Sequence, residues 1–316
     1  MNHQLNLGTS YLVDGLLPFS DELRINVHEL NCGGRVLDFG IEAAGSLQAG
    51  LELAKVCMSD LVAISLSPTE IEGISWQNVN VHSDAPVAAC LLSQYAGWQI
   101  SIEKYFAMGS GPMRVVAAIE ELFEKLNYSE KAEQIVGVLE TSQLPTDGVF
   151  EYLSEKTGVA VKDITLLVAP TASQAGNIQV VARSVETALH KLFELGFDVN
   201  RIKSGYGSAP LPPVAKDDLT GIGRTNDAIL YGGRVTLWVT GDDESIAETG
   251  AKVPASSSDE YGKPFLQIFE DAGRDFYKID PHLFSPAEIV FQNLDTGNVH
   301  RYGSVNHAVV RESFGI

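Results

Sequence analysis

The chain has 316 residues, 45% hydrophobic and 20% charged, and carries a formal net charge of −19 at pH 7. The composition is that of an ordinary globular protein, and the length suits two moderate hydrophobic cores better than one large core. Because the acidic residues are spread along the sequence, the expected surface repels phosphate backbones and anionic membranes. Nucleic acid and membranes are therefore not expected as partners.

The three cysteines, Cys32, Cys57 and Cys90, lie far apart, and none has a histidine at ligand spacing. A sparse, odd set argues for a reducing compartment and against a disulfide framework or a zinc site. The N-terminal segment has no basic region followed by an apolar run, and no apolar stretch is long enough to cross a membrane. These features predict a cytoplasmic protein without a metal site.

Apolar periodicity and the positions of glycine and proline predict alternating helices and strands. In chain order, the first half is expected to contain a helix at Asp14–Ser20, strands at Leu23–Leu30 and Arg35–Ile41, a helix at Ala44–Met58, strands at Leu61–Leu66 and Val79–Ser83, and a helix at Ala88–Gln94. The apolar run Leu61–Leu66 is typical of a buried strand.

The second half continues the alternation and contains the longest predicted helix. Its expected elements are a helix at Arg114–Leu126, a strand at Ile135–Glu140, a helix at Asp147–Thr157, a strand at Ile164–Ala169, a helix at Gly176–Leu195, strand-like segments over 202–241, and a strand pair at Ile289–Gln292 and Asn298–Tyr302.

Strands interleaved with helices are typical of an α/β or α+β fold. We expect a two-domain subunit with mixed sheets flanked by helices and an interdomain cleft. The sequence favours an N-terminal lobe over residues 1–115 and a C-terminal lobe over residues 116–316, and the pattern is also compatible with a discontinuous domain.

Polar glycine-rich segments interrupt the apolar pattern and are predicted to be loops, at Ala107–Pro112, Ala169–Gly176, Gly205–Pro213 and Gly221–Asp227. Glycine permits close backbone approach, and N–H groups ahead of a helix bind anions. None of the segments is a Walker A loop or completes a dinucleotide fingerprint. A tight turn explains any one of them, but together they favour a cleft, with Ser110, Gly111, Thr171 and Ser173 as candidate substrate-binding residues.

A narrow polar stripe runs along the predicted helix Gly176–Leu195. It consists of Gln179, Arg183, Glu186 and His190, at spacings of four, three and four residues. Helical neighbours at these spacings touch, so Arg183 and Glu186 can pair. One interpretation is an exposed ion pair. The other is a site in which the carboxylate orients and deprotonates a water while the guanidinium and Gln179 bind polar substrate groups.

A series of stretches in the same order across nearly the whole chain resembles a known family. They are Cys90–Trp98, Lys104–Pro112, Leu167–Ser173, Arg183–Thr187, Thr225–Tyr231, Asp259–Phe265 and Phe276–Pro281. Together they resemble the methenyltetrahydromethanopterin cyclohydrolase family, and the length of this chain also suits that family.

The resemblance implies a two-domain α/β subunit that assembles as a homotrimer. It implies a hydrolase of one-carbon metabolism and methylotrophy that needs no metal or redox cofactor. Its pterin substrate would be 5,10-methenyltetrahydromethanopterin, and its product 5-formyltetrahydromethanopterin. The family's catalytic arginine and glutamate fall on Arg183 and Glu186, the pair that the helical stripe selects. In this interpretation Glu186 activates the attacking water and Arg183 fixes Glu186 and nearby pterin oxygens.

One position departs from the family pattern. Archaeal relatives often have a lysine within a Ser-Gln-Lys-Ala-Gly-Trp motif, where this chain has Tyr95. Tyrosine keeps a hydroxyl and a stacking face but lacks the charge. Tyr95 is therefore a candidate for substrate binding rather than catalysis, and it points to a bacterial, methylotroph-type branch.

Two other function classes remain as alternatives. A phosphate-ligand enzyme, such as a kinase or a sugar-phosphate isomerase, would use the glycine loops to hold anions, and a kinase would require ATP and magnesium. A non-catalytic pterin-binding or nucleotide-binding protein would bind its ligand without removing the near-ultraviolet absorbance of the methenyl group.

Overall fold

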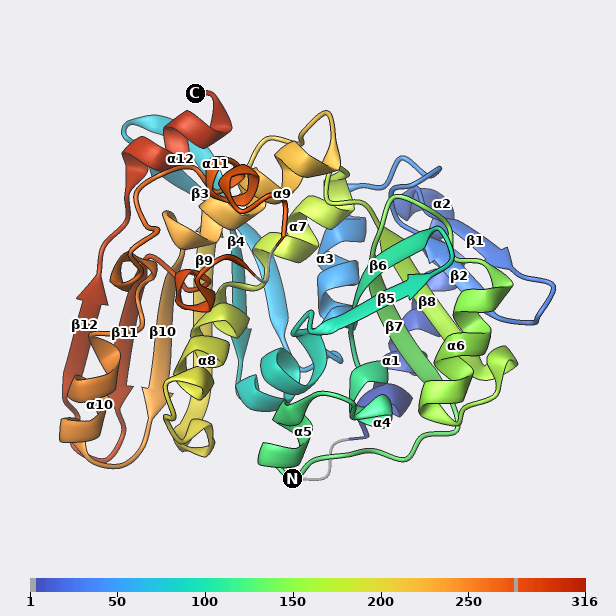
Figure 1. Ribbon diagram of the computed structural model, residues 1–316, viewed down its shortest axis with the longest axis horizontal. Helices are drawn as coiled ribbons and strands as arrows, with labels where there is room; N and C mark the ends of the chain where they lie inside the picture. The colour runs from blue at the N-terminus through green and yellow to red at the C-terminus, as the bar shows by residue number, and fades with distance from the viewer. Residues whose placement is uncertain (1–3, 276–277) are drawn as a thin grey trace. The chain divides into compact units, whose positions relative to one another are not determined.

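Each of two units of the chain contains a six-stranded mixed sheet (Figure 1). The computed structural model describes residues 4–275 and 278–316, so Phe276 and Tyr277 of the matched stretch Phe276–Pro281 lie outside the described residues. Unit 1 comprises the described residues up to Leu61 together with Ala88–Gln179. Unit 2 comprises Val62–Val87 together with the described residues from Val180 onwards. The predicted α/β class with mixed sheets is confirmed.

The boundary expected between residues 115 and 116 stays a prediction, because the structure does not show which segments fold independently. In both units the chain leaves and returns, so each unit is built from segments that are distant in sequence.

Unit 1 carries a sheet in the order β1-β2-β8-β7-β6-β5, in which β2, β8 and β7 are parallel and the outer pairs are antiparallel. Its elements are α1 (Leu5–Leu16), α2 (Ser20–Leu23), β1 (Asn26–Glu29), β2 (Arg35–Asp38), α3 (Leu47–Cys57), most of a π-helix (Val87–Gln94), β5 (Trp98–Ile102), β6 (Tyr105–Ser110), α4 (Met113–Ala117), α5 (Glu121–Lys125), β7 (Ile135–Glu140), α6 (Asp147–Thr157), β8 (Ile164–Ala169) and most of α7 (Gln174–Val181).

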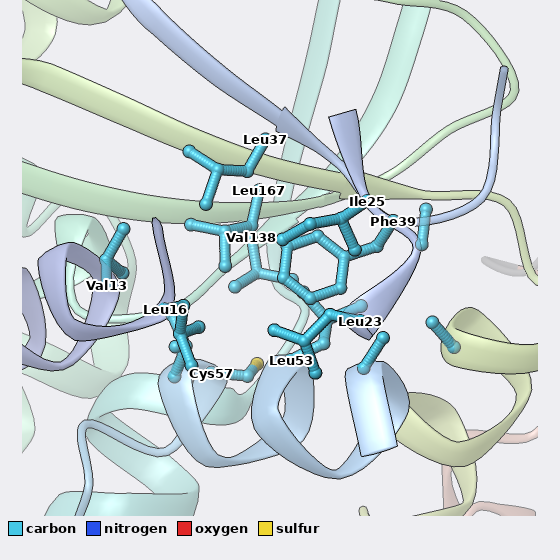
Figure 2. Close-up of a cluster of buried hydrophobic side chains, with 14 of the residues drawn as sticks. Val13, Leu16, Leu23, Ile25, Leu37, Phe39, Leu53, Cys57, Val138 and Leu167 are labelled. Carbon is cyan, nitrogen blue, oxygen red and sulfur yellow. The ribbon is translucent and has the colours of Figure 1, made fainter. Parts of the chain in front are cut away.

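The two faces of this sheet pack into separate hydrophobic clusters, because successive side chains of a strand point to opposite faces. On β8, Leu167 and Ala169 belong to the cluster that contains α1 and α3. Figure 2 shows Leu37 and Leu167 of this cluster above Leu53 of α3. On the same strand, Leu166 and Val168 belong to the opposite cluster, which contains α6.

Unit 2 carries a sheet in the order β12-β11-β10-β9-β4-β3, in which β10 and β11 pair parallel and the other neighbours pair antiparallel. Its elements are β3 (Ala63–Ile71), β4 (Ile74–Ser83), α8 (Ser184–Glu194), β9 (Ile202–Pro210), α9 (Asp218–Leu230), β10 (Arg234–Val239), α10 (Asp243–Gly250), α11 (Phe265–Asp271), β11 (Glu288–Asn293), β12 (Val299–Gly303) and α12 (His307–Phe314).

Several predicted elements of the first half are displaced or wrong. The first helix begins at Leu5 rather than Asp14 and ends at Leu16, and a short 3₁₀ turn that contains Pro18 follows over Leu17–Phe19. The strand at Ala63–Ile71 is not buried: it lies at the edge of its sheet, and among its residues only Ile71 is fully buried. The segment Ala107–Pro112 is not a loop, because most of it forms the end of β6.

Two predicted helices are interrupted. The helix expected over Arg114–Leu126 consists of α4 and α5, because Ala118 adopts a left-handed conformation with φ 45° and turns the chain. The helix expected over Gly176–Leu195 consists of α7 and α8. Between them, the N–H of Arg183 bonds to the carbonyl of Val180 at 3.1 Å, a tighter i→i−3 bond that breaks the regular ladder.

The segment 202–241 contains a helix that the sequence did not predict. The expected loop Gly221–Asp227 lies inside α9, whose N-cap residue Asp217 accepts the N–H of Thr220 at 2.8 Å. A Cβ atom on Gly223 would lie 3.0 Å from Cβ of Leu266, so this glycine permits close packing within a helix. None of the helices in the described part of the chain combines the length and apolarity required to cross a bilayer.

Candidate functional site

Arg183 and Glu186 lie at the start of α8 in unit 2. Arg183 is the N-cap residue of this helix, and Glu186 lies in its first turn. Their exposed fractions are only 7% and 5%, so the interpretation of the pair as an exposed surface ion pair is wrong. Since a buried charge requires compensation, a buried arginine and glutamate at one helix end are more typical of a functional or structural site than of a surface.

The predicted polar stripe is not continuous, because Gln179 belongs to α7 whereas Glu186 and His190 belong to α8. The N-terminal end of α8 carries a partial positive charge, which favours a carboxylate in the first turn. At the other end of the stripe, the His190 ring lies 3.8 Å from the Glu194 carboxylate. The helix break therefore separates Gln179 from the other members and leaves Glu186 at a helix terminus.

Two glycines of β9 set how closely α8 approaches the sheet of unit 2. A Cβ atom on Gly207 would lie 2.3 Å from Oγ of Ser184, and one on Gly205 would lie 2.9 Å from a methyl group of Val185. The prediction of an anion-binding loop at Gly205–Pro213 is wrong for residues 205–210, which belong to β9. Its glycines provide space for the turn of α8 that carries Glu186.

Lys191 anchors the C-terminal half of α8. Its side chain is buried, and its Nζ donates a hydrogen bond to the carbonyl of His282 at 2.5 Å and to Oγ of Ser257 at 3.4 Å. Burial lowers the pKa of Lys191 to about 8, and the nearby charge of Asp280 opposes this shift. This role could not be predicted from local sequence patterns, since the partners lie 66 and 91 residues away.

Thr171 and Ser173 lie in unit 1, in the segment between β8 and α7. The hydroxyl of Thr171 donates a hydrogen bond to the carboxylate of Glu140, the last residue of β7. The hydroxyl of Ser173 donates to the carbonyl of Pro170 at 2.7 Å and accepts the N–H of Gly176 at 3.0 Å. Ser173 therefore caps the start of α7, and Thr171 joins two parallel strand ends.

Ser110 and Gln179 contact the same sulfur atom inside unit 1. The Ser110 hydroxyl lies 3.3 Å from Cys57 Sγ and donates to the carbonyl of Val138 at 3.2 Å. The Gln179 side chain donates to Cys57 Sγ at 3.4 Å. Gly111 follows with φ 88°, and its N–H bonds to the carbonyl of Ser93 at 2.8 Å. These three residues make internal contacts, and their role in substrate binding stays a prediction.

Tyr95 follows the π-helix Val87–Gln94, a rare element that is frequent at functional sites. Its side chain is half-buried, and its ring centroid lies 5.1 Å from Cζ of Arg114, a cation–π distance. The Tyr95 ring therefore packs against the positive charge of Arg114, whereas a lysine at this position would carry a positive charge of its own.

Arg114 is a fully buried residue that the sequence did not identify. Its Nη1 donates to the carbonyls of Leu91, Leu92 and Ser93, at the end of the π-helix. Its Nη2 lies 2.6 Å from Oε1 of Glu120, in an ion pair of which the arginine side chain is fully buried. Because the turn at Ala118 is needed to bring Glu120 back to Arg114, the helix interruption serves this pair.

The carboxylate of Asp38 shapes the segment that follows β2. It is fully buried and accepts four backbone N–H groups, from Gly40, Ile41, Glu42 and Ala43, at 2.6 to 2.9 Å. A Cβ atom on Gly40 would lie 2.5 Å from Oγ of Ser173, so this segment packs tightly against the one after β8. The carboxyl ends of β2, β8 and β7 therefore carry a rigid set of polar groups.

Within residues 4–275 and 278–316, no cluster of three or more histidine, cysteine, aspartate or glutamate side chains is arranged to hold a metal ion.

Comparison with known proteins identifies the family. The model of the family described as Cyclohydrolase (MCH) matches residues 4–314. A methenyltetrahydromethanopterin cyclohydrolase of Rhodopirellula baltica is 48% identical over 90% of this chain and 87% of its own length. Proteins of the same name from Methylobacillus flagellatus and Methanosarcina mazei are 42% and 40% identical, over 98% and 97% of this chain and 95% and 97% of their own lengths.

These matches extend over almost all of the chain, through both units, and they confirm the resemblance that the sequence stretches indicated. The chain belongs to the MCH cyclohydrolase family, and it is a hydrolase of that family.

Proposed function

We propose that this cyclohydrolase hydrolyses 5,10-methenyltetrahydromethanopterin to 5-formyltetrahydromethanopterin in one-carbon metabolism. The observation that carries the proposal is the burial of Arg183 and Glu186 at one helix end, in a chain that belongs to the cyclohydrolase family. The names of the relatives supply the substrate. We also propose a homotrimeric, cytoplasmic enzyme, as the resemblance implies.

In the proposed mechanism, the bridging carbon of the substrate needs no further activation, because it is part of an amidinium-like cation. Glu186 accepts a proton from the attacking water, whose oxygen bonds to that carbon. The resulting tetrahedral adduct carries a hydroxyl group. As one C–N bond breaks, this hydroxyl loses its proton to solvent and becomes the carbonyl oxygen of the formyl group on the other nitrogen. The proton held by Glu186 passes to the departing nitrogen, so the carboxylate is regenerated.

Arg183 has two roles in this proposal. Its fixed positive charge orients the Glu186 carboxylate before the water is bound, and its planar N–H groups bind polar oxygens of the pterin. Both residues belong to the same short segment, three positions apart in sequence, so their relative position is set by the first turn of α8.

The remaining predicted contacts differ in how well their surroundings support a role in substrate binding. Thr171 lies at the carboxyl ends of parallel strands, where ligands commonly bind, and Tyr95 presents a half-buried ring for stacking. Ser173 caps a helix, and Ser110, Gly111 and Gln179 contact other interior groups. We propose that Thr171 and Tyr95 contact the substrate, with the other four supporting the segments that carry them.

The kinase or isomerase alternative loses much of its basis. It required four glycine-rich anion loops, but one of these segments lies within α9 and another begins as β9.

The proposal is tested by adding the purified protein to methenyltetrahydromethanopterin and following the near-ultraviolet absorbance of the methenyl group. We expect this absorbance to disappear without ATP or magnesium, with the 5-formyl isomer identified by chromatography. Binding without loss of absorbance would instead identify a non-catalytic pterin-binding protein, and appearance of the 10-formyl isomer would contradict the proposed direction of C–N cleavage.

A further inference from the structure

The connections that follow β7 and β8 leave the sheet of unit 1 on opposite faces. After β7 the chain enters α6, whose Val149, Phe150 and Leu153 pack in the cluster on one face. After β8 it enters α7, whose Ala175 packs in the cluster on the other face, together with α3. Since β7 and β8 are adjacent and parallel, their carboxyl ends form a topological switch point.

Ligands of open α/β sheets bind outside the carboxyl ends of the strands at such a point, because the two connections diverge there. Glu140 is the last residue of β7, and Thr171 comes two residues after the end of β8. The hydrogen bond from the Thr171 hydroxyl to the Glu140 carboxylate joins the two strand ends. Neither residue is used by the acid–base chemistry assigned to Arg183 and Glu186.

Glu140 differs from the other carboxylate at this edge of the sheet. Asp38, at the end of β2, is fully buried, and its two oxygens are occupied by four backbone N–H groups. Glu140 is half-buried, and among the described residues its carboxylate accepts a hydrogen bond only from the Thr171 hydroxyl. A carboxylate has about four lone-pair sites, so Glu140 can still accept two further N–H groups.

We infer that Glu140, oriented by Thr171, recognises the N–H edge of the substrate's pterin ring. The inference rests on the proposed function for the identity of the substrate. A pterin carries an exocyclic amine next to a ring N–H, and these two donors point in the same direction. A carboxylate accepts such a pair side by side, as it accepts the paired N–H groups of arginine.

The arrangement around Glu140 suits recognition rather than proton transfer. The Thr171 hydroxyl donates to one oxygen of the Glu140 carboxylate and so fixes the orientation of the group. Glu140 is the last residue of β7 and is paired with Met108 of β6 and Ala169 of β8, so its carboxylate is presented from a backbone that the sheet fixes on both sides. Glu140 is therefore assigned to substrate specificity.

The inference is tested by steady-state kinetics of Glu140→Gln, which keeps the shape but replaces one acceptor oxygen with a donor. A charged hydrogen bond of this kind corresponds to about a 10- to 100-fold effect on binding. We expect KM to rise by about that factor and kcat to change by less than about threefold. Glu151→Gln, on the exposed face of α6, is the matched control and should leave both constants unchanged.

A substrate analogue without the exocyclic amine separates recognition from structural support. If Glu140 binds that amine, the analogue should be hydrolysed with a high KM by the unmodified enzyme, and Glu140→Gln should raise that KM further by much less than it does with the full substrate. An equal increase with both substrates would overturn the inference.

Thr171 provides a second variant in case Glu140→Gln does not fold. Thr171→Val removes the hydroxyl that orients Glu140, so KM should rise by a smaller factor than in Glu140→Gln, and Thr171→Ser should restore the original value. A folded Glu140→Gln enzyme with an unchanged KM would overturn the inference while leaving the proposed function intact. Failure of the unmodified enzyme to hydrolyse the substrate would instead contradict the proposed function.

Discussion

A Cβ atom on Gly207 would lie 2.3 Å from Oγ of Ser184, closer than non-bonded atoms can approach. Gly207 is in β9, and Ser184 is the first residue of α8, between Arg183 and Glu186 in sequence. The depth at which the proposed catalytic turn lies on the sheet of unit 2 is thus set by a residue without a side chain.

Gly207→Ala is expected to displace this turn and to reduce kcat by at least about tenfold, because a misplacement of about 1 Å can have a large effect on a positioned catalytic group. Steady-state hydrolysis measures the effect. The double variant Gly207→Ala with Ser184→Ala should recover part of the activity, since the closest atom is removed. Gly8→Ala is the matched control, because a Cβ atom there would meet nothing within 4 Å. A fully active Gly207→Ala enzyme would contradict the claim that Gly207 sets the position of the first turn of α8.

Asp227 on α9 makes the stability of the protein depend on pH. Its carboxylate is fully buried and accepts the N–H of Phe265 at 2.8 Å, and burial raises the pKa of Asp227 to about 7. In the unfolded chain the pKa of an aspartate is about 3.9. Between these two values the folded state binds more protons than the unfolded state, so stability falls as the pH rises from about 4 to about 7.

The difference corresponds to a loss of a few kcal/mol across this range, on the order of 4 kcal/mol at most. Asp227→Asn should remove most of this dependence, because an amide does not ionise, and its relative stability should be greatest above pH 7. Urea unfolding at about pH 5 and pH 8 measures both effects. The control Glu248→Gln, at an exposed position of α10, should keep the original pH dependence. If the free energy of unfolding changed with pH as much in Asp227→Asn as in the unmodified protein, Asp227 would not be the source of the pH dependence.

The buried ion pair of Arg114 and Glu120 should be far more important for stability than the exposed pair of Lys125 and Glu121 in the same region. Arg114→Met leaves the Glu120 carboxylate without its cation and removes the Arg114 donor from the carbonyls of Leu91 and Leu92, whereas the Ser93 carbonyl keeps the N–H of Gly111. The unpaired buried carboxylate should reduce the free energy of unfolding by about 3–5 kcal/mol. Lys125→Met should reduce it by no more than about 1 kcal/mol. Denaturant unfolding of the two variants provides the comparison. Equal losses of free energy of unfolding would contradict the larger stabilising role assigned to the buried pair.

Strong local patterns allowed much of the fold to be predicted. The predicted bounds of β7, α6 and β8 agree with the structure, because each has a continuous apolar or amphipathic pattern between clear turn residues. The interruption between α7 and α8 could not be predicted, since neither Ala182 nor Arg183 is a helix-breaking residue. Helix α9 was missed because its glycines were interpreted as turns, although Gly223 packs against Leu266.

The candidate site was predicted only where its members are close in sequence. Arg183 and Glu186 are three residues apart, so helical spacing and family resemblance both selected them. Glu140 and Thr171 are 31 residues apart, and their hydrogen bond depends on the parallel pairing of β7 with β8. Lys191 and its partner His282 are 91 residues apart. Such contacts arise from the packing of the chain, which local patterns do not specify.

The proposed role of Glu186 as the base that activates water is tested most directly by comparing Glu186→Gln with the unmodified enzyme in the absorbance assay. Glu194→Gln, at an exposed position of the same helix, serves as the control. With folding and substrate binding preserved, Glu186→Gln should reduce kcat by at least about 10²-fold, as expected for the loss of a positioned base, and Glu194→Gln should not. Hydrolysis by Glu186→Gln at nearly the rate of the unmodified enzyme would contradict the mechanism.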